Sequence, residues 1–124
     1  MNFLWVTITV NNLDESIKFY EDIIGLKLSS RRRSGGDKEI AFLEDGKSIT
    51  LVELYCYDEG SPVLVGQDYS IGFETDSVEE CIKLANEKNL KILSDILQPS
   101  PKVKFFFIAD PDGRKVQLLE RIKQ

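Results

Sequence analysis

Two stretches of this chain carry the same pattern of residues. The segment NNLDESIKF, residues 11–19, matches DSVEECIKL, residues 76–84, and Ser16-Ile17-Lys18 falls on Cys81-Ile82-Lys83, an offset of 81 − 16 = 65. A repeat of this length indicates that one supersecondary unit is built twice. A single unit of this size buries too little apolar surface for a good core, so we expect two units to pack together.

Each half of the chain shows one strand, one helix and three further strands. Apolar runs with β-branched residues or alternating polarity indicate the strands, and the matched segments indicate the helices. In the first half, strands are predicted at residues 3–10, 26–32, 39–43 and 48–57. In the second half, they are predicted at residues 69–75, 90–97, 103–109 and 115–121.

The two predicted helices begin with the same capping pattern. Asn12 is followed three residues later by Glu15, and Ser77 by Glu80, which is the spacing of a capping box. Gly25 is placed to end the first helix in the left-handed conformation. Turns are predicted at residues 45–46 and 111–113, and a surface loop at residues 98–101.

Two longer segments resemble a known family. TVNNLDESIKFYEDIIGLKL, near the N-terminus, and IADPDGRKVQLLE, near the C-terminus, are similar to the first strand, helix and closing motif of the vicinal oxygen chelate superfamily. That superfamily includes glyoxalase I, bleomycin resistance proteins and extradiol dioxygenases. The resemblance implies an α+β fold of two βαβββ repeats, whose curled mixed sheets form a concave cleft. We therefore expect one domain over residues 1–124, made of units 1–60 and 67–124.

Strand alternation assigns one face of each strand to the core and the other to the cleft. On the first strand, Val6 and Ile8 are expected to pack under a helix, which leaves Trp5 and Thr7 on the opposite face. The same reasoning places Glu53 and Tyr55, Ser70, and Gln117 on the opposite face of their strands. Apolar walls with a few polar groups are typical of a small-molecule pocket.

The resemblance also implies four metal ligands, two from each half, at positions that fall here on Trp5, Glu53, Ser70 and Gln117. Only Glu53 is a strong ligand, because an indole is only a donor, and a hydroxyl and an amide oxygen are weak neutral ligands. We therefore expect neither a metal nor another cofactor. Three interpretations of Gln117 remain open: a half-exposed strand residue, a contact to a ligand, or a metal ligand.

Composition narrows the classes of function. The chain has a net charge of −5 and no histidine, which argues against a nucleic-acid partner and removes the commonest general base. It has no apolar run long enough to span a membrane and no signal-peptide pattern, so we expect a cytoplasmic protein with no membrane partner. Cys56 and Cys81 are then expected to be reduced. Arg31-Arg32-Arg33 reads as a solvated loop, an anion contact or a subunit contact.

The predicted function is non-catalytic binding of a small organic molecule by a homodimeric protein. The residues expected to contact the ligand are Trp5, Thr7, Glu53, Tyr55, Ser70 and Gln117. One alternative is a glyoxalase-like lyase, isomerase or dioxygenase with a degenerate metal site. Others are a metal-free enzyme that uses Glu53 as a base, or a scaffold without a ligand.

Overall fold

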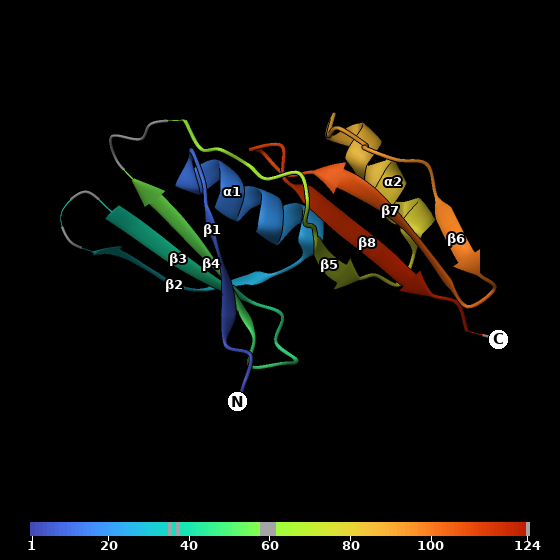
Figure 1. Cartoon of the computed structure of the whole chain (residues 1–124), viewed down its shortest axis with the longest axis horizontal. Coiled ribbons are helices and arrows are strands. Elements are labelled where there is room, and N and C mark those ends of the chain that lie inside the picture. The colour runs from blue at the N-terminus through green and yellow to red at the C-terminus, as the bar shows by residue number, and fades with distance from the viewer. Residues whose placement is uncertain (35, 37, 58–61, 124) are drawn as a thin grey trace. The chain divides into compact units, whose positions relative to one another are not determined.

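The computed structural model describes residues 1–34, 36, 38–57 and 62–123 and divides the chain into two compact units, Met1–Leu64 and Val65–Gln124. Each unit holds one four-stranded sheet and one α-helix that packs on a face of that sheet (Figure 1). The prediction of a single domain with units 1–60 and 67–124 stays a prediction.

The first unit contains the sheet β1-β4-β3-β2. Its elements are β1 (Trp5–Thr9), α1 (Leu13–Phe19), a π-helical turn (Tyr20–Ile24), β2 (Lys27–Ser34), β3 (Lys38–Glu44) and β4 (Leu51–Tyr57). The first strand runs parallel to β4, and the other pairs are antiparallel. The first and last strands of the unit are therefore neighbours.

Helix α1 begins as its sequence predicts, and the predicted glycine ends the π-helical turn that continues it. The backbone N–H of Glu15 donates to Oδ1 of Asn12 over 3.0 Å, which satisfies one of the unpaired donors at the helix N-terminus. Gly25 ends the π-helical turn with φ +90°, a conformation that a side chain disfavours. Leu13 and Ile17 are buried on the side of α1 that packs against β3 and β4.

The second unit repeats this arrangement as the sheet β5-β8-β7-β6, again with the outer strand β5 parallel to β8. Its elements are β5 (Ile71–Glu74), α2 (Val78–Glu87), β6 (Leu97–Ser100), β7 (Val103–Ala109) and β8 (Lys115–Arg121). Ser77 caps α2 by accepting a hydrogen bond from the Glu80 N–H. The prediction of two βαβββ repeats with mixed sheets is confirmed.

The strand predicted at residues 90–97 is wrong. Before Leu97, only Ile92 of this segment forms a bridge, to Ile108 of β7, and the Ser94 hydroxyl accepts the hydrogen bond of the Phe107 N–H in place of a backbone partner. The edge strand is instead β6, which begins at Leu97, includes Pro99 and lies mostly in the segment predicted as a loop. Proline is compatible with an edge strand because its missing N–H faces away from the sheet.

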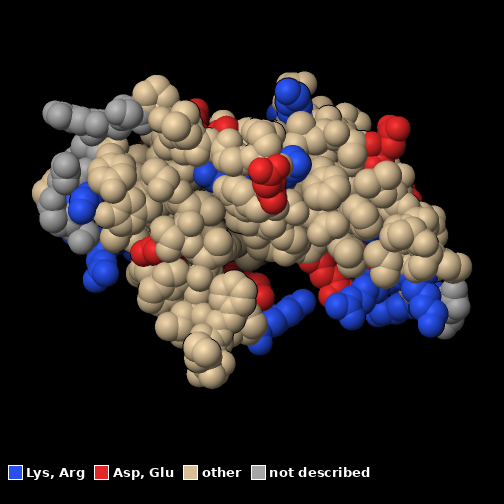
Figure 2. Space-filling view, in the orientation of Figure 1, with Lys and Arg blue, Asp and Glu red and all other residues tan. Residues whose placement is uncertain are grey.

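The helix-covered face of each sheet forms the core of its unit. In the first unit this face presents Ile8, Ala41, Leu43 and Leu54, all buried. On the face that Figure 2 shows, residues other than Lys, Arg, Asp and Glu cover most of the surface, and acidic and basic side chains occur in small groups, some of them side by side. No helix among the described residues is long and apolar enough to cross a membrane.

The capping residues give a direct test of the helix boundaries. Replacing Asn12 with Ala removes the acceptor for the Glu15 N–H and should lower the free energy of unfolding by about 1 kcal/mol. Asn2→Ala, at an exposed position before β1, should change it by less than about 0.5 kcal/mol. Urea denaturation followed by circular dichroism measures both values. Equal values for the two variants would contradict the assigned cap.

Candidate functional site

The face of the first sheet that α1 does not cover carries most of the predicted site residues. Cross-strand pairing places Thr7 opposite Glu53 and Glu53 opposite Phe42. The neighbouring rows contain Trp5 with Leu51, and Thr9 with Tyr55. Directly paired residues project to the same side of a sheet. We call this side the open face of the first sheet. It brings together Trp5, Thr7, Glu53 and Tyr55, as strand alternation predicts.

At the centre of the open face, the Thr7 hydroxyl donates a hydrogen bond to Oε1 of Glu53. The two residues are 46 positions apart in the sequence and meet because β1 runs parallel to β4. Glu53 is half-buried. The contact therefore fixes the direction of a carboxylate that can accept further hydrogen bonds from a ligand.

Aromatic rings surround this carboxylate on the same face. The rings of Trp5 and Phe42 meet edge to face with centroids 5.4 Å apart, and those of Tyr55 and Tyr57 do so at 5.2 Å. Trp5 is 45% exposed and Tyr57 is 44% exposed. Half-exposed rings that hold one another in place form a ready surface for a planar molecule.

A cation lies against these rings. The Nζ atom of Lys38 is 6.0 Å from the ring centroid of Tyr55 and 5.9 Å from that of Tyr57, within range of a cation–π contact. The sequence analysis did not select Lys38. Its place follows from its pairing with Tyr57, and single-strand alternation does not reveal which residue of β3 faces which residue of β4.

In the second unit, Gln117 occupies the position on β8 that Glu53 occupies on β4. Each is the third residue of its strand, and Gln117 pairs with Gly72 as Glu53 pairs with Thr7. A Cβ added at Gly72 would lie 3.2 Å from Oε1 of Gln117. The absence of a side chain at residue 72 therefore leaves room for the Gln117 amide. The second repeat thus has an amide at the position where the first repeat has the carboxylate of Glu53.

Ser70 lies just before β5, beside a hollow within the second unit. The hollow has a volume of about 510 Å³, and its lining includes Tyr69, Ser70, Phe107 and Lys115. Phe107 pairs with Gln117 across β7 and β8, so the hollow borders the open face of the second sheet. The structure thus places Ser70 and Gln117 in a different unit from the other four predicted residues. Whether they share a ligand with those four stays a prediction.

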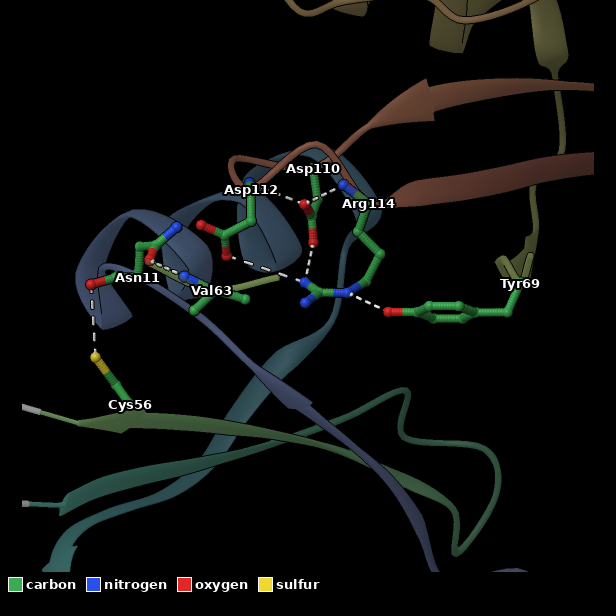
Figure 3. A network of polar contacts seen from close by, with 7 residues as sticks. All are labelled: Asn11, Cys56, Val63, Tyr69, Asp110, Asp112 and Arg114. Carbon is green, nitrogen blue, oxygen red and sulfur yellow. Dashed lines mark hydrogen bonds and ion pairs between the residues drawn. The ribbon is translucent and has the colours of Figure 1, made fainter. Parts of the chain in front are cut away.

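A buried ion pair holds the residue before Ser70. Nη1 of Arg114 is 2.7 Å from Oδ2 of Asp110, and Nε of Arg114 donates to the Tyr69 hydroxyl over 2.8 Å (Figure 3). The backbone N–H groups of Asp112 and Arg114 also donate to Asp110. Burial opposes the charge on Arg114, but its hydrogen bonds to Tyr69 and Asp110 raise its pKa above the ordinary value. The turn between β7 and β8 is therefore tied to the start of β5.

The donors at the four family positions do not fit a divalent metal. Trp5 offers no lone pair, Ser70 and Gln117 offer neutral oxygens, and the Glu53 carboxylate already accepts a hydrogen bond from Thr7. In the described parts of the chain, no three side chains of His, Cys, Asp or Glu gather in a way that could hold a metal ion. The expectation that the protein works without a metal stays a prediction.

Comparisons with known proteins agree with this architecture. The family model described as Glyoxalase/Bleomycin resistance protein/Dioxygenase superfamily matches residues 2–118. The uncharacterized protein YwbC of Bacillus subtilis is 30% identical over 92% of this chain and 93% of its own length. The lactoylglutathione lyase of Haemophilus influenzae is 27% identical over 97% of this chain and 93% of its own.

A solved structure adds a three-dimensional likeness. The structure of the trypanothione-dependent glyoxalase I of Leishmania major has a TM-score of 0.82 and 25% sequence identity to this chain. The match covers 97% of this chain and 86% of that one. This chain therefore has a fold similar to that of a solved glyoxalase.

The ion pair of Arg114 and Asp110 predicts a large loss of stability on mutation. Arg114→Ala leaves the buried Asp110 carboxylate without its cation and should lower the free energy of unfolding by about 3–5 kcal/mol. The matched control is Arg121→Ala, because Arg121 lies 3.7 Å from Glu74 in a pair whose side chains are 75% and 60% exposed. This control should cost no more than about 1 kcal/mol in the same urea titration. A small effect of Arg114→Ala would contradict the role of the network.

Proposed function

Because the chain belongs to the glyoxalase/bleomycin resistance protein/dioxygenase superfamily, we propose that it binds a small organic molecule on the open face of the first sheet, without a metal. Trp5, Thr7, Glu53 and Tyr55 are the residues that contact this ligand. Binding without chemical conversion is the function that the residue set supports best, because the acids and imidazoles of a metal-dependent enzyme are missing at three of the four family positions.

The observation that carries this proposal is an oriented carboxylate within a surface of rings. Glu53, held by Thr7, can accept hydrogen bonds from a donor group on the ligand. The rings of Trp5 and Tyr55 lie in the adjacent rows of the same face and can stack on its planar part. A surface that was only solvated would not need Trp5 and Tyr57 on it, since exposing rings to water is unfavourable.

Catalysis is the second candidate function, and the relatives favour it. A protein named lactoylglutathione lyase is similar over nearly the full length of the chain, and so is a solved glyoxalase I. Glu53 keeps the carboxylate that a proton transfer would need. An enzyme of this kind would use Glu53 as the base, and its activity would be lost in Glu53→Gln.

We also propose a homodimer and a cytoplasmic location. Phe3, Leu4 and Ile49 are exposed by 68%, 52% and 64%, and a second copy of the chain is a suitable cover for such an apolar surface. Sedimentation of the purified chain tests the dimer.

The proposed location rests on the cysteines. Neither cysteine forms a disulfide, which suits a reducing compartment.

Binding can be followed through Trp5, the only tryptophan in the chain. Titration with 2-(aminomethyl)naphthalene, an aromatic amine, should change the Trp5 emission, because the ring would stack on the indole while the amine donates to Glu53. Glu53→Gln should raise the dissociation constant about tenfold. The control is Glu87→Gln, an exposed residue of α2 with the same change of charge. Equal dissociation constants for both variants would place the ligand elsewhere.

Metal dependence can be tested on the native chain. It should show no thermal stabilisation by Zn²⁺ or Ni²⁺ and no lactoylglutathione lyase activity with either ion. An ion that bound the folded chain would stabilise it by about 2.7 kcal/mol at a hundred times its dissociation constant. Such a stabilisation would contradict the proposal of binding without a metal.

A further inference from the structure

We infer that the ligand of the open face is an aromatic molecule with an anionic group at one end and a hydrogen-bond donor at the other. Arg32 and Lys38 would contact the anionic group, and Glu53 would contact the donor. This inference rests on the function proposed above and adds the chemical class of the ligand. It follows from the order in which charges appear along the sheet.

The pairing register places Arg32 on the open face although it lies two strands away from β4. Arg32 of β2 pairs with Ile40 of β3, and Ile40 pairs with Tyr55 of β4. Lys38 pairs with Tyr57 in the next row. Lys38 therefore lies beside the two tyrosines, and Arg32 lies in the row of Tyr55 on the far side of Ile40. Both cations are at the end of the face that is nearest to the C-terminus of β4.

From its centre to its other end, the same face carries acidic residues. Glu53 lies one row from Tyr55, and Glu44 lies one row further, where it pairs with Leu51 opposite Trp5. Tyr57 lies four positions beyond Glu53, which is roughly 13 Å along a strand. Tyr55 supplies a ring in the row between them, and Phe42 supplies one in the row of Glu53. A molecule with two linked rings and one polar group at each end therefore matches the length and the charges of the face.

Arg32 differs from the two neighbouring arginines, whose side chains bond to other parts of the folded chain. Arg31 and Arg33 alternate with it and project to the helix-covered side of β2. Arg31 forms ion pairs with Asp14 of α1 over 2.6 Å and with Glu39 over 2.9 Å. The hydrogen bonds that Arg31 donates to Glu39 and Asp14 raise its pKa.

The guanidinium of Arg32, by contrast, forms no hydrogen bond or ion pair with the described residues, and this residue is exposed. A guanidinium that needs no partner for the fold is available to a ligand. Its planar fork can bind a carboxylate through two parallel hydrogen bonds, and Lys38 adds a point charge beside it. The contact between Lys38 and the tyrosine rings keeps that charge near the ring surface.

Three probes that share one biphenyl scaffold test the inference. The first is 4′-(aminomethyl)biphenyl-4-carboxylate, which carries both charges; the second is its methyl ester, which keeps only the amine; the third is its N-acetyl derivative, which keeps only the carboxylate. Calorimetric titration gives the dissociation constant of each. The native chain should bind the doubly charged probe about three- to tenfold more tightly than the ester.

The variant Arg32→Gln, Lys38→Gln should weaken binding of the two carboxylate probes about three- to tenfold and leave the ester unchanged. The unchanged ester also shows that the variant is folded and that its ring surface is intact. Arg33→Gln, an adjacent arginine on the other side of the same strand, should leave all three dissociation constants as they are.

The outcomes separate this inference from the function proposed above. The inferred anionic end of the ligand is wrong if the native chain binds the ester as tightly as the doubly charged probe. It is also wrong if the double variant weakens binding of the ester as much as binding of the two carboxylate probes. In both cases the proposal of binding on the ring surface is kept. If the native chain binds none of the three probes, both proposals fail.

Discussion

Parallel pairing of the first strand with the last strand of each unit is the constraint on which the candidate site depends. In the first unit, this pairing sets Thr7 beside Glu53, and a hydroxyl contact fixes the carboxylate there. A shift of one residue would turn Glu53 toward the core and Leu54 outward. The buried Leu54 and Ile8 therefore hold the register, so the apolar core of the unit also aims the polar groups of its open face.

The sequence predicts the parts of this fold that depend on local patterns. The caps at Asn12 and Ser77 follow from the capping box, and the face of Glu53 follows from strand alternation. The segment 90–97 is apolar enough to resemble a strand. There, however, the Ser94 hydroxyl accepts a hydrogen bond that a backbone carbonyl would accept in a regular sheet, and strand propensities do not predict this side-chain contact. The place of Lys38 depends on how β3 aligns with β4, which the loop length decides and the strand pattern does not.

The two halves show how a repeat can diverge without losing its backbone. Thr7 with Glu53 and Gly72 with Gln117 occupy the same paired positions of their sheets. One pair presents a charged acceptor supported by a hydroxyl, and the other a neutral amide above a glycine. An amide can both donate and accept, so the second sheet can recognise groups that the first cannot. Family membership thus establishes the scaffold, while activity depends on these side chains.

The position of β2 at the edge of the first sheet has a consequence for solubility. An edge strand exposes unpaired backbone groups to which a strand of another chain can add. Three consecutive arginines in β2 place positive charge on both sides of this edge, so an identical strand that approached it would meet like charges. At one edge of the second sheet, β6 carries Pro99, which has no N–H to offer to an incoming strand. The edge strands β2 and β6 are thereby protected from open-ended sheet growth in a crowded cell.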